Sequence, residues 1–560
     1  MARERMTKEE RLAYFNRLVT PDTKLMDLFD EMTILCGDGI FIKEYESGQT
    51  VTWNEMHRWT DTVAKGLIAY GIEKGDHVLI WGKNSVEWVV CFLACLKIGA
   101  ISVLGNTANK ESETAYLLKN GDIKMILMDE GLSSVRYEEV MENLCPGCLD
   151  RIWNGSGEFP FLQYIISFDT EKTDNRRISL ADVEAAGTNI TDKELAEREA
   201  NVVASDIINI QYTSGTTGDP KGAMWDQRCL LYNLQGISTD VEMYRGDKLY
   251  TSIPIFHNFG LLGCIVFPII YGITVVFSNK FKPEEFLRAL YEERPAMTMG
   301  VTTMFLAMLS CPEFHAYDFS GYEMRIVLAG SLCPQRLLEA LRNDFKTDKV
   351  IVLYGLTEAA ASANTNMSDP LKQQLTSIGK ASGGYTFRIC DPVTRKPLPA
   401  GEEGEIAIKG IAVMRGYYKK PEETAKVLDE DGWFYTGDIA CMDENGYVYI
   451  SGRAKDMINR GGEKIYPKEV ENFLLSHPAI SDAQIVGVPS ERYGEEVMAY
   501  IITKAGEVLT EEEVKEYVRA HMAVYKTPKY VRFIDSFPCT LSGKVQKYKL
   551  VERARKELGL

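Results

Sequence analysis

Residues 207–222 read IINIQYTSGTTGDPKG, an apolar run followed by glycines, hydroxyl side chains and a lysine. Glycines let the backbone approach an anion closely, and successive N–H groups in such a turn form a concave anion site. Lys221 adds a point charge suited to phosphate. The spacing differs from the Walker pattern, which has four residues between its first glycine and its Gly-Lys pair. The stretch therefore predicts a phosphate-binding loop between the end of an apolar strand and the start of a helix, and it disfavours an ordinary P-loop ATPase or kinase.

Outward from this loop, short apolar runs alternate with helical patterns from about residue 25 to residue 350. The strand-like runs are HVLIWG (77–82), AISVLG (100–105), MILMD (125–129), TVVFS (274–278) and RIVLAG (325–330). Near-continuous apolar strands separated by helices are typical of parallel sheets that are covered on both faces. We therefore expect an α/β fold with two covered, mostly parallel sheets.

The pattern changes towards the C-terminus. After residue 380, runs such as GEIAIKG and GYVYISG alternate apolar and polar residues, which predicts a smaller antiparallel or barrel-like β region. From about Lys455 onward, short strands (483–488 and 497–502) are mixed with helices such as 510–521, which indicates a small α+β unit. The first twenty-five residues predict an exposed amphipathic helix, and residues 131–200 give no clear pattern.

Composition excludes several classes of protein. The chain has 560 residues, more than one hydrophobic core organises, and a net charge of −17, which argues against nucleic-acid binding. The twelve cysteines are scattered and no secretory signal is present, so we expect a cytoplasmic protein. Residues 259–277 carry no charge, but glycines and Pro268 interrupt them. We expect a buried helix and a buried strand there rather than a membrane span.

Four later blocks accompany the phosphate loop. They are Tyr354-Gly355-Leu356-Thr357-Glu358, Tyr435-Thr436-Gly437-Asp438, the stretch 452–465 that begins Gly452-Arg453-Ala454-Lys455, and Leu541-Ser542-Gly543-Lys544. In this order the set resembles the AMP-forming adenylating superfamily, which contains acyl-CoA synthetases, luciferases and peptide-synthetase adenylation domains. The resemblance covers roughly residues 25 to 552. It implies an N-terminal extension (1–25), a large adenylating domain (26–454) and a small mobile C-terminal domain (455–560) with its hinge at Lys455.

The resemblance also implies the nucleotide site. Its residues would be Thr213, Ser214, Gly215, Thr216, Thr217, Gly218, Lys221, Gly330, Ser331, Tyr354, Gly355, Leu356, Thr357, Asp438, Arg453 and Lys544. Thr213 and Glu358 would hold Mg²⁺, a hard cation that takes one or two protein oxygens together with phosphate. Thr357, Glu358 and Lys544 would be catalytic, and Asp438 would accept hydrogen bonds from the ribose hydroxyls.

The acid and thiol sites are implied by shorter matches. The acyl pocket would be bordered by His257, Asn258, Gly300, Val301 and Ala360, and the CoA tunnel by Gly461, Gly462, Glu463 and Lys464. The Gly-Gly pair is equally compatible with a simple tight turn. The matching positions after the phosphate loop are Asp226-Gln227, where many members have a Ser/Thr-His pair. The segment 254–260 has no aspartate of the kind that amino-acid-activating relatives carry.

These residues predict one reaction class. A carboxylate would attack the α-phosphorus of ATP to form acyl-AMP, and CoA would then take the acyl group, releasing AMP. A medium- or long-chain fatty acid is favoured, because residues 359–363 are small and the neighbouring stretches have no cation for a second carboxylate.

Alternative functions are the activation of an aromatic acid, the loading of a carrier protein in trans, and a non-catalytic nucleotide sensor. We expect small-molecule partners, and a homodimer is compatible with the family. Cys145 and Cys148 are interpreted as reduced structural residues.

Overall fold

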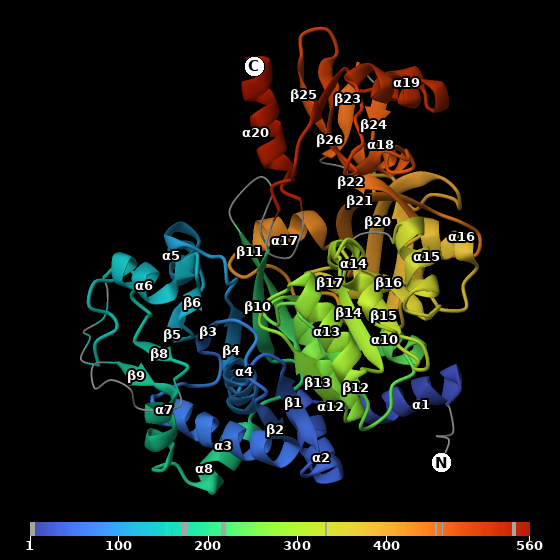
Figure 1. Ribbon diagram of the computed structural model, residues 1–560. Coiled ribbons are helices and arrows are strands. Elements are labelled where there is room, and N and C mark those ends of the chain that lie inside the picture. Colours follow the sequence, from blue (N-terminus) through green and yellow to red (C-terminus); the bar gives the residue numbers. More distant parts are fainter. Residues whose placement is uncertain are drawn as a thin grey trace. The chain divides into compact units, whose positions relative to one another are not determined.

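The computed structural model (Figure 1) describes residues 6–151, 153, 155, 157–169, 177–213, 220–330, 333–453, 456–461, 463–539 and 545–560. The chain divides into two compact units. The first comprises residues 1–375, 380–386 and 409–432, and the second comprises 376–379, 387–408 and 433–560. The second unit therefore takes in part of the small β region, which the sequence placed in the larger domain. The predicted boundary at Lys455 falls on a residue outside the described ones and stays a prediction.

A seven-stranded sheet carries the strand that precedes the phosphate loop. Its order is β11 (Lys221–Asp226), β10 (Ile207–Thr213), β4 (Ile101–Leu104), β3 (His77–Trp81), β5 (Ile123–Met128), β8 (Tyr164–Ser167) and β9 (Ile178–Ser179). Neighbouring strands are parallel except β10 and β11, which are antiparallel. Every residue of β3 is buried, as the unbroken apolar run predicts for a central parallel strand.

A nine-stranded sheet forms the rest of the framework of the first unit. Its order is β18 (Lys380–Ala381), β17 (Ala359–Asn364), β16 (Val350–Leu356), β15 (Arg325–Ala329), β14 (Met297–Val301), β12 (Lys248–Thr251), β13 (Thr274–Phe277), β1 (Ile40–Glu44) and β2 (Thr50–Thr52). The strands from β16 to β1 are parallel, and antiparallel pairs close both edges. Together the two sheets confirm the predicted α/β class with mostly parallel strands.

Helices cover these sheets. Apart from the helical segment 258–271, the described helices of the first unit are α1 (Lys8–Leu18), α2 (Leu25–Cys36), α3 (Trp53–Ala69), α4 (Val86–Ile98), α5 (Glu111–Asn120), α6 (Tyr137–Leu144), α7 (Leu180–Gly187), α8 (Asp192–Ala200), α9 (Gln227–Tyr232), α10 (Gln235–Asp240), α13 (Pro283–Glu293), α14 (Thr302–Leu309), η2 (Phe314–Ala316), α15 (Gln335–Asn343), α16 (Leu371–Thr376) and α17 (Pro421–Val427). Ser85 caps the start of α4, and Gly99 ends it with φ +75°. Since α4 is apolar on all sides, it is almost wholly buried. A short hairpin of β6 (Gly131–Leu132) and β7 (Val135–Arg136) precedes α6.

The uncharged segment 259–277 folds as a buried helix followed by a buried strand, which confirms the prediction. It comprises α11 (Asn258–Leu261), a π-helical turn η1 (Leu262–Val266), α12 (Phe267–Tyr271) and β13. Gly272 ends the helix with φ +64°, and β13 follows two residues later. Within the described part of the chain, none of the helices combines the length and the apolar character that crossing a bilayer requires.

The predicted N-terminal helix is present as α1, but the expectation that it would be exposed is wrong for its inner face. Phe15 is fully buried, and Arg11 is buried with its Nε donating to the carbonyl of Thr239, 2.8 Å away. A capping box between Thr7 and Glu10 starts the helix. The sequence shows amphipathic spacing but not which surface the apolar face covers, and here that surface includes α10.

The second unit contains two mostly antiparallel β-sheets. The four-stranded sheet runs β19 (Tyr385–Cys390), β20 (Glu403–Gly410), β21 (Phe434–Met442) and β22 (Val448–Arg453), and it confirms the predicted small β region. The other sheet contains β24 (Glu463–Ile465), β23 (Ile458–Arg460), β26 (Gly494–Thr503), β25 (Ile480–Ser490) and β27 (Tyr530–Phe533). The described helices are α18 (Pro467–Leu474), α19 (Glu511–His521), η4 (Val524–Lys526) and α20 (Lys547–Leu558).

The hairpin of β25 and β26 is buried on both faces. Ile485 and Ala499 face one apolar cluster, which includes residues of α18 and α19, and Val486 and Met498 face another, which includes residues of α20. Successive side chains of a strand point to opposite faces, so one hairpin supplies both clusters. The predicted α+β character of the C-terminal part is thereby explained.

Candidate active site

The two ends of the predicted phosphate loop lie on adjacent strands. Thr213 closes β10 and Lys221 opens β11, and these residues are direct partners in the antiparallel register. The Thr213 hydroxyl donates to the Lys221 carbonyl, 3.3 Å away. Ser214, Gly215, Thr216, Thr217 and Gly218 lie outside the described residues, so their predicted role stays a prediction. The loop therefore joins two paired strands, and the expectation that a helix starts directly after it is wrong: β11 comes first and α9 begins only at Gln227.

Lys221 is held by an acidic residue that the sequence reasoning did not single out. Its Nζ lies 2.5 Å from Oε2 of Glu423 on α17 and 5.3 Å from the centroid of the Tyr417 ring. The other oxygen of Glu423 accepts a hydrogen bond from Lys426. These two lysines lower the pKa of Glu423 to about 2, so its carboxylate is charged at neutral pH.

Glu358 is bound by the same tyrosine. The Tyr417 hydroxyl donates a 2.6 Å hydrogen bond to Oε1 of Glu358, and the Glu358 carbonyl accepts from the Met414 amide at 2.8 Å. Burial, reinforced by the neighbouring carboxylate, raises the pKa of Tyr417, so the phenol keeps its proton at any pH near neutrality. Tyr417 thus contacts both Lys221 and Glu358, which belong to separate sequence blocks.

The block 354–358 turns tightly out of β16 into β17. Side chains bind two successive backbone carbonyls at the start of the turn: Trp225 Nε1 donates to Thr357 at 2.9 Å, and Asn258 Nδ2 donates to Leu356 at 3.1 Å. A Cβ on Gly355 would lie 2.6 Å from the amide nitrogen of Ala361, which itself has φ +45°. Glycine is therefore required at 355 because the two strands approach each other closely there.

Other predicted residues of the first unit meet at one edge of the nine-stranded sheet. Since β14, β15 and β16 are adjacent and parallel, their carboxyl ends lie together. That edge carries Val301, Gly330 and Tyr354, from three of the predicted stretches. Gly330 has φ +86°, which favours glycine, and a Cβ there would lie 3.5 Å from Val301. Ser331 lies outside the described residues.

The predicted acyl-pocket residues differ in exposure. His257 is exposed and forms the N-cap of α11, whereas Asn258 and Ala360 are buried. The Ala360 carbonyl accepts a hydrogen bond from the Tyr385 hydroxyl at 3.0 Å. A Cβ on Gly300 would lie 2.7 Å from the Phe305 ring, so glycine is required by packing within β14 and α14. The pocket assignment stays a prediction.

In the second unit, Asp438 and Arg453 form an ion pair. They are register partners on β21 and β22, and Arg453 Nε lies 2.7 Å from Oδ1 of Asp438, whose side chain is only 6% exposed. The Asp438 amide donates to the Thr436 hydroxyl at 3.0 Å, and Gly437, with φ +73°, donates its N–H to Glu405 at 2.7 Å. The two predicted ribose-side residues are therefore adjacent and fixed by the backbone.

Of the residues predicted for CoA, Gly461 directly follows β23 and Glu463 begins β24. Gly461 has φ +63° and donates its N–H to the Tyr493 carbonyl at 2.8 Å, and Glu463 is exposed. These contacts agree with the alternative of a structural turn and leave the CoA role a prediction. Gly462, Lys455, Lys544 and the side chain of Lys464 lie outside the described residues.

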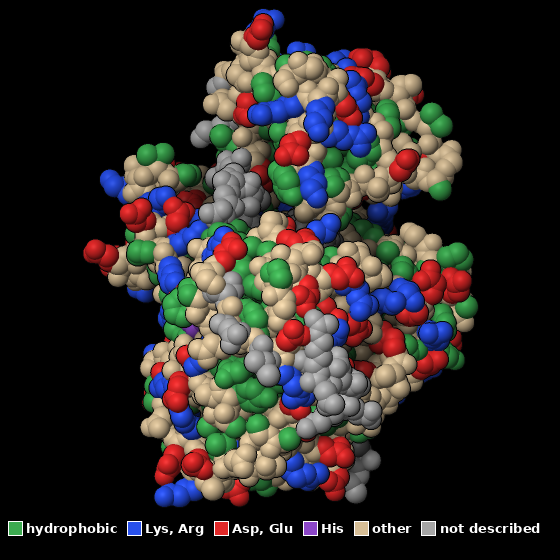
Figure 2. Space-filling view, turned by 90° about the vertical axis from the view of Figure 1, so that its left-hand side faces the viewer, with side chains coloured by type: hydrophobic (Ala, Val, Ile, Leu, Met, Phe, Trp, Pro, Cys, Tyr) green, Lys and Arg blue, Asp and Glu red, His purple; other side chains and the backbone are tan. Residues whose placement is uncertain are grey.

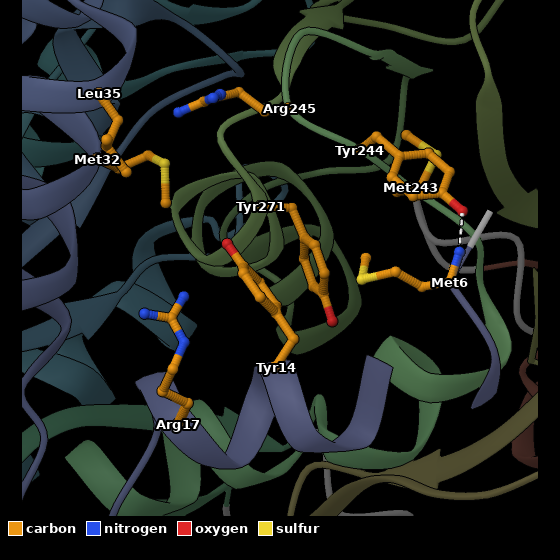
Figure 3. Close-up of a pocket in the computed structure, with 9 residues that line it drawn as sticks. All are labelled: Met6, Tyr14, Arg17, Met32, Leu35, Met243, Tyr244, Arg245 and Tyr271. Carbon is orange, nitrogen blue, oxygen red and sulfur yellow. Dashed lines mark hydrogen bonds between the residues drawn. The ribbon is translucent and has the colours of Figure 1, made fainter. Parts of the chain in front are cut away.

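Three further features lie away from the predicted site. A cavity of about 290 Å³ (Figure 3) is lined by Met6, Tyr14, Arg17, Met32, Leu35, Met243, Tyr244, Arg245 and Tyr271, none of them a predicted site residue.

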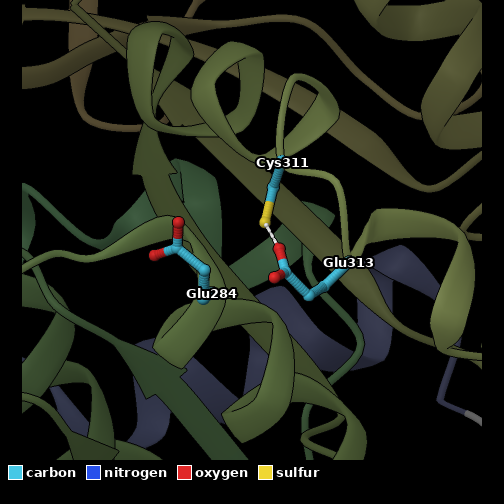
Figure 4. A group of neighbouring side chains, drawn as sticks. All are labelled: Glu284, Cys311 and Glu313. Atoms are coloured by element: carbon cyan, nitrogen blue, oxygen red, sulfur yellow. Dashed lines mark hydrogen bonds between the residues drawn. The ribbon is translucent and has the colours of Figure 1, made fainter.

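A group of three side chains (Figure 4) consists of Glu284, Cys311 and Glu313, and within it the Cys311 thiol donates a hydrogen bond to Glu313 at 2.9 Å. Cys145 and Cys148 are buried and form no disulfide, and burial raises the pKa of Cys148 to about 12. Both cysteines belong to one buried apolar cluster, and their interpretation as reduced structural residues stays a prediction.

The expectation that the protein does not bind nucleic acid stays a prediction. On the face shown in Figure 2, acidic and basic side chains are interspersed instead of forming one broad basic field. A phosphate-backbone binder presents clustered lysines and arginines.

Comparison with known proteins establishes the family. Residues 35–418 match the AMP-binding enzyme model and residues 469–544 match the AMP-binding enzyme C-terminal domain model, so the chain belongs to this enzyme family. It is 38% identical over 498 residues to the YngI protein of Bacillus subtilis, which carries the name of an acyl-CoA synthetase (88% of this chain, 89% of that protein). It is 36% identical over 518 residues to the mitochondrial medium-chain acyl-CoA ligase ACSF2 of Mus musculus (90% and 83%).

A solved structure supports the same conclusion. ATP-bound MatB from Rhodopseudomonas palustris superimposes with a TM-score of 0.79 at 26% identity, covering 95% of this chain and 99% of that one. The family and the fold class expected from the ordered blocks are confirmed.

Proposed function

We propose that the protein is an ATP-dependent acid–CoA ligase that makes acyl-AMP and then acyl-CoA, with AMP and pyrophosphate as products. The observation that carries this proposal is the convergence of Lys221 and Glu358 on Tyr417. A phosphate-binding lysine and a metal-binding carboxylate must act on the same triphosphate. Their common contact supports that arrangement within one compact unit.

The chemistry explains why such charges are needed. An anionic carboxylate must approach a triphosphate that carries about four negative charges, so positioning and electrostatic stabilisation dominate catalysis. Lys221 would offset charge on the β- and γ-phosphates, and the backbone of the block 354–358 would orient the α-phosphate. In the second unit, Asp438 would accept hydrogen bonds from the ribose hydroxyls while Arg453 holds its carboxylate in place.

The oxygen donors fit Mg²⁺. A carboxylate offers about four lone-pair positions, and the Tyr417 hydrogen bond uses one of those on Glu358. The Thr213 hydroxyl donates its proton to a carbonyl, so its oxygen keeps lone pairs for a cation. Thr213 and Glu358 would hold the ion, which would neutralise phosphate charge when bound.

The acid that we propose is a medium- or long-chain fatty acid. The strand β17 supplies buried small residues from Ala359 to Ala363 beside Glu358, which suits an apolar chain. The names of the relatives, an acyl-CoA synthetase and a medium-chain acyl-CoA ligase, point in the same direction. We further propose that Lys544 stabilises the charge that develops during adenylation. Rotation of the C-terminal domain at Lys455 would then allow transfer of the acyl group to CoA. In that arrangement, the CoA tunnel would be bordered by Gly461, Gly462, Glu463 and Lys464.

A panel of carboxylic acids tests the proposal. AMP release would be measured with C4 to C16 fatty acids, benzoate and cinnamate, each with and without CoA. We expect the highest kcat/KM for a fatty acid and a strong dependence on CoA. A preference for benzoate would show that the substrate is an aromatic acid and not a fatty acid. Activity with phosphopantetheinyl carriers alone would show that the acyl acceptor is a carrier protein and not CoA. ATP–pyrophosphate exchange that is absent with every acid would indicate a non-catalytic nucleotide sensor.

A further inference from the structure

The helix α17 places a carboxylate directly on the lysine of the phosphate loop. Glu423 lies 2.5 Å from Lys221 Nζ, and the side chains are 31% and 30% exposed. Partly exposed pairs of this kind contribute little to stability. Since the pair is weak, a stabilising role is an insufficient reason for its position at a predicted phosphate site.

The backbone fixes Glu423 in this place. The segment 416–418 runs along β11: the Met224 amide donates to the Gly416 carbonyl at 2.9 Å, and the Tyr418 amide donates to the Gly222 carbonyl at 2.8 Å. The Tyr417 amide then donates to the hydroxyl of Thr424, in the first turns of α17, at 2.9 Å. The helix that carries Glu423 is therefore tied to the strand that begins at Lys221.

We propose that Glu423 is a displaceable counter-ion that occupies Lys221 until the β- and γ-phosphates of a nucleotide replace it. This inference rests on the proposed role of Lys221 in phosphate binding. The carboxylate carries one negative charge, whereas the triphosphate carries about four, so the lysine exchanges one anion for a stronger one. Because Glu423 must first leave Lys221, the affinity is lowered for every ligand whose phosphates bind this lysine. The affinity for AMP is unchanged, because AMP has no β- or γ-phosphate.

A second lysine receives the displaced carboxylate. Lys426, one turn along α17, already donates to the other oxygen of Glu423. When Lys221 turns to phosphate, Glu423 keeps this partner and is not left as an unpaired charge beside the ligand. The exchange therefore requires only a rearrangement of side chains on α17 and β11.

Calorimetric titration without acid substrate tests the counter-ion. ATP, pyrophosphate and AMP would be titrated into wild-type protein, Glu423→Gln and Glu422→Gln, the last as a matched control because Glu422 is the exposed neighbour on the same helix. In Glu423→Gln the Kd for ATP and pyrophosphate should fall about 1.5- to 5-fold, the range that corresponds to an exposed ion pair. The Kd for AMP should not change, and Glu422→Gln should match wild type for all three ligands.

The variant Lys221→Ala tests the phosphate-binding role of Lys221 separately from the counter-ion role of Glu423. Unchanged ATP binding in Lys221→Ala would overturn the phosphate role itself. Weaker ATP binding in Lys221→Ala combined with unchanged or weaker binding in Glu423→Gln would overturn only the counter-ion, and would make Glu423 a structural partner of the lysine. A parallel gain for AMP in Glu423→Gln would also contradict the proposal, because AMP lacks the phosphates that displace the carboxylate.

Discussion

Tyr417 donates its phenolic proton to Glu358 across 2.6 Å, although the two residues are 59 positions apart in the sequence. The phenol is buried and stays protonated, so it is a permanent donor to this carboxylate. Its ring lies against Lys221 at the same time. One side chain thus contacts both groups that we propose to act on the same triphosphate.

Tyr417→Phe is expected to lower kcat/KM roughly tenfold, because a hydrogen bond to a charged group is worth about 1.5–3 kcal/mol. The Mg²⁺ concentration for half-maximal rate should rise, since the Glu358 carboxylate is no longer held. AMP release measured over a range of Mg²⁺ concentrations provides the test. Tyr418→Phe is the matched control, because Tyr418 loses a similar 2.8 Å hydrogen bond to Asp122. An equal loss in both variants would indicate a general packing effect.

Glu358→Gln and Asp438→Ala should affect nucleotide binding differently. The first should weaken Mg²⁺-dependent turnover and leave AMP affinity nearly intact, since AMP lacks the β- and γ-phosphates. The second should weaken ATP and AMP alike and lower the melting temperature, because Arg453 loses its partner beside a buried position. Calorimetric titration with both nucleotides distinguishes the roles, and exchanged results would mean that the assignments are reversed.

Lys544→Ala should reduce adenylation by roughly 10²-fold or more, the size of losing one preorganised charge stabiliser. Transfer to CoA from supplied acyl-adenylate should survive, because that step would use the other arrangement of the domains. Rates of the two half-reactions, measured separately, give the answer. An equal fall in both would contradict the two-step role of the C-terminal domain.

Lys455→Pro is expected to stall the second half-reaction. Proline fixes φ near −65° and removes an N–H, which prevents the backbone rotation proposed at this position. The observable is a burst of about one equivalent of pyrophosphate per enzyme followed by little acyl-CoA. Lys455→Ala, which removes the charge and leaves the backbone mobile, should support both steps. Normal CoA turnover in the proline variant would exclude the hinge.

The free energy of unfolding should decrease as the pH falls below about 6.5, in part because of His77. This imidazole is buried on β3, and burial lowers its pKa below the ordinary 6.5. The unfolded chain therefore binds the proton more readily, and stability is lost between pH 6.5 and the lower folded pKa, by about 1.4 kcal/mol for each pKa unit.

Urea unfolding at pH 7.5 and 5.5 tests this sign. His77→Gln should show a smaller loss between the two pH values than wild type. His315→Gln serves as the control, because His315 is exposed. A loss in His77→Gln as large as in wild type would exclude the contribution of His77.

Local patterns in the sequence were sufficient for much of the fold. The apolar runs at 77–82, 274–278 and 325–330 are strands of the two sheets, and the interrupted run 259–277 is the predicted helix and strand. These features depend on side-chain periodicity and on breakers a few residues apart. Residues 131–200 contain α6, α7 and α8, which the sequence did not reveal because their apolar faces are short.

The sequence by itself determined the family and located the predicted phosphate loop and the acidic turn at Glu358, because each resides in a contiguous block. That this loop is followed by a strand and not by a helix was decided by the fold. Only the tertiary structure revealed the hydrogen bond between Tyr417 and Glu358 and the ion pair between Glu423 and Lys221. It also showed that the inner face of α1 is buried. The stretch RGYYKKPEETAK (415–426) reads as a polar surface turn, since charged and aromatic residues there follow no period. Contacts between residues distant in the chain depend on strand register and loop path, and these are properties of the folded chain as a whole.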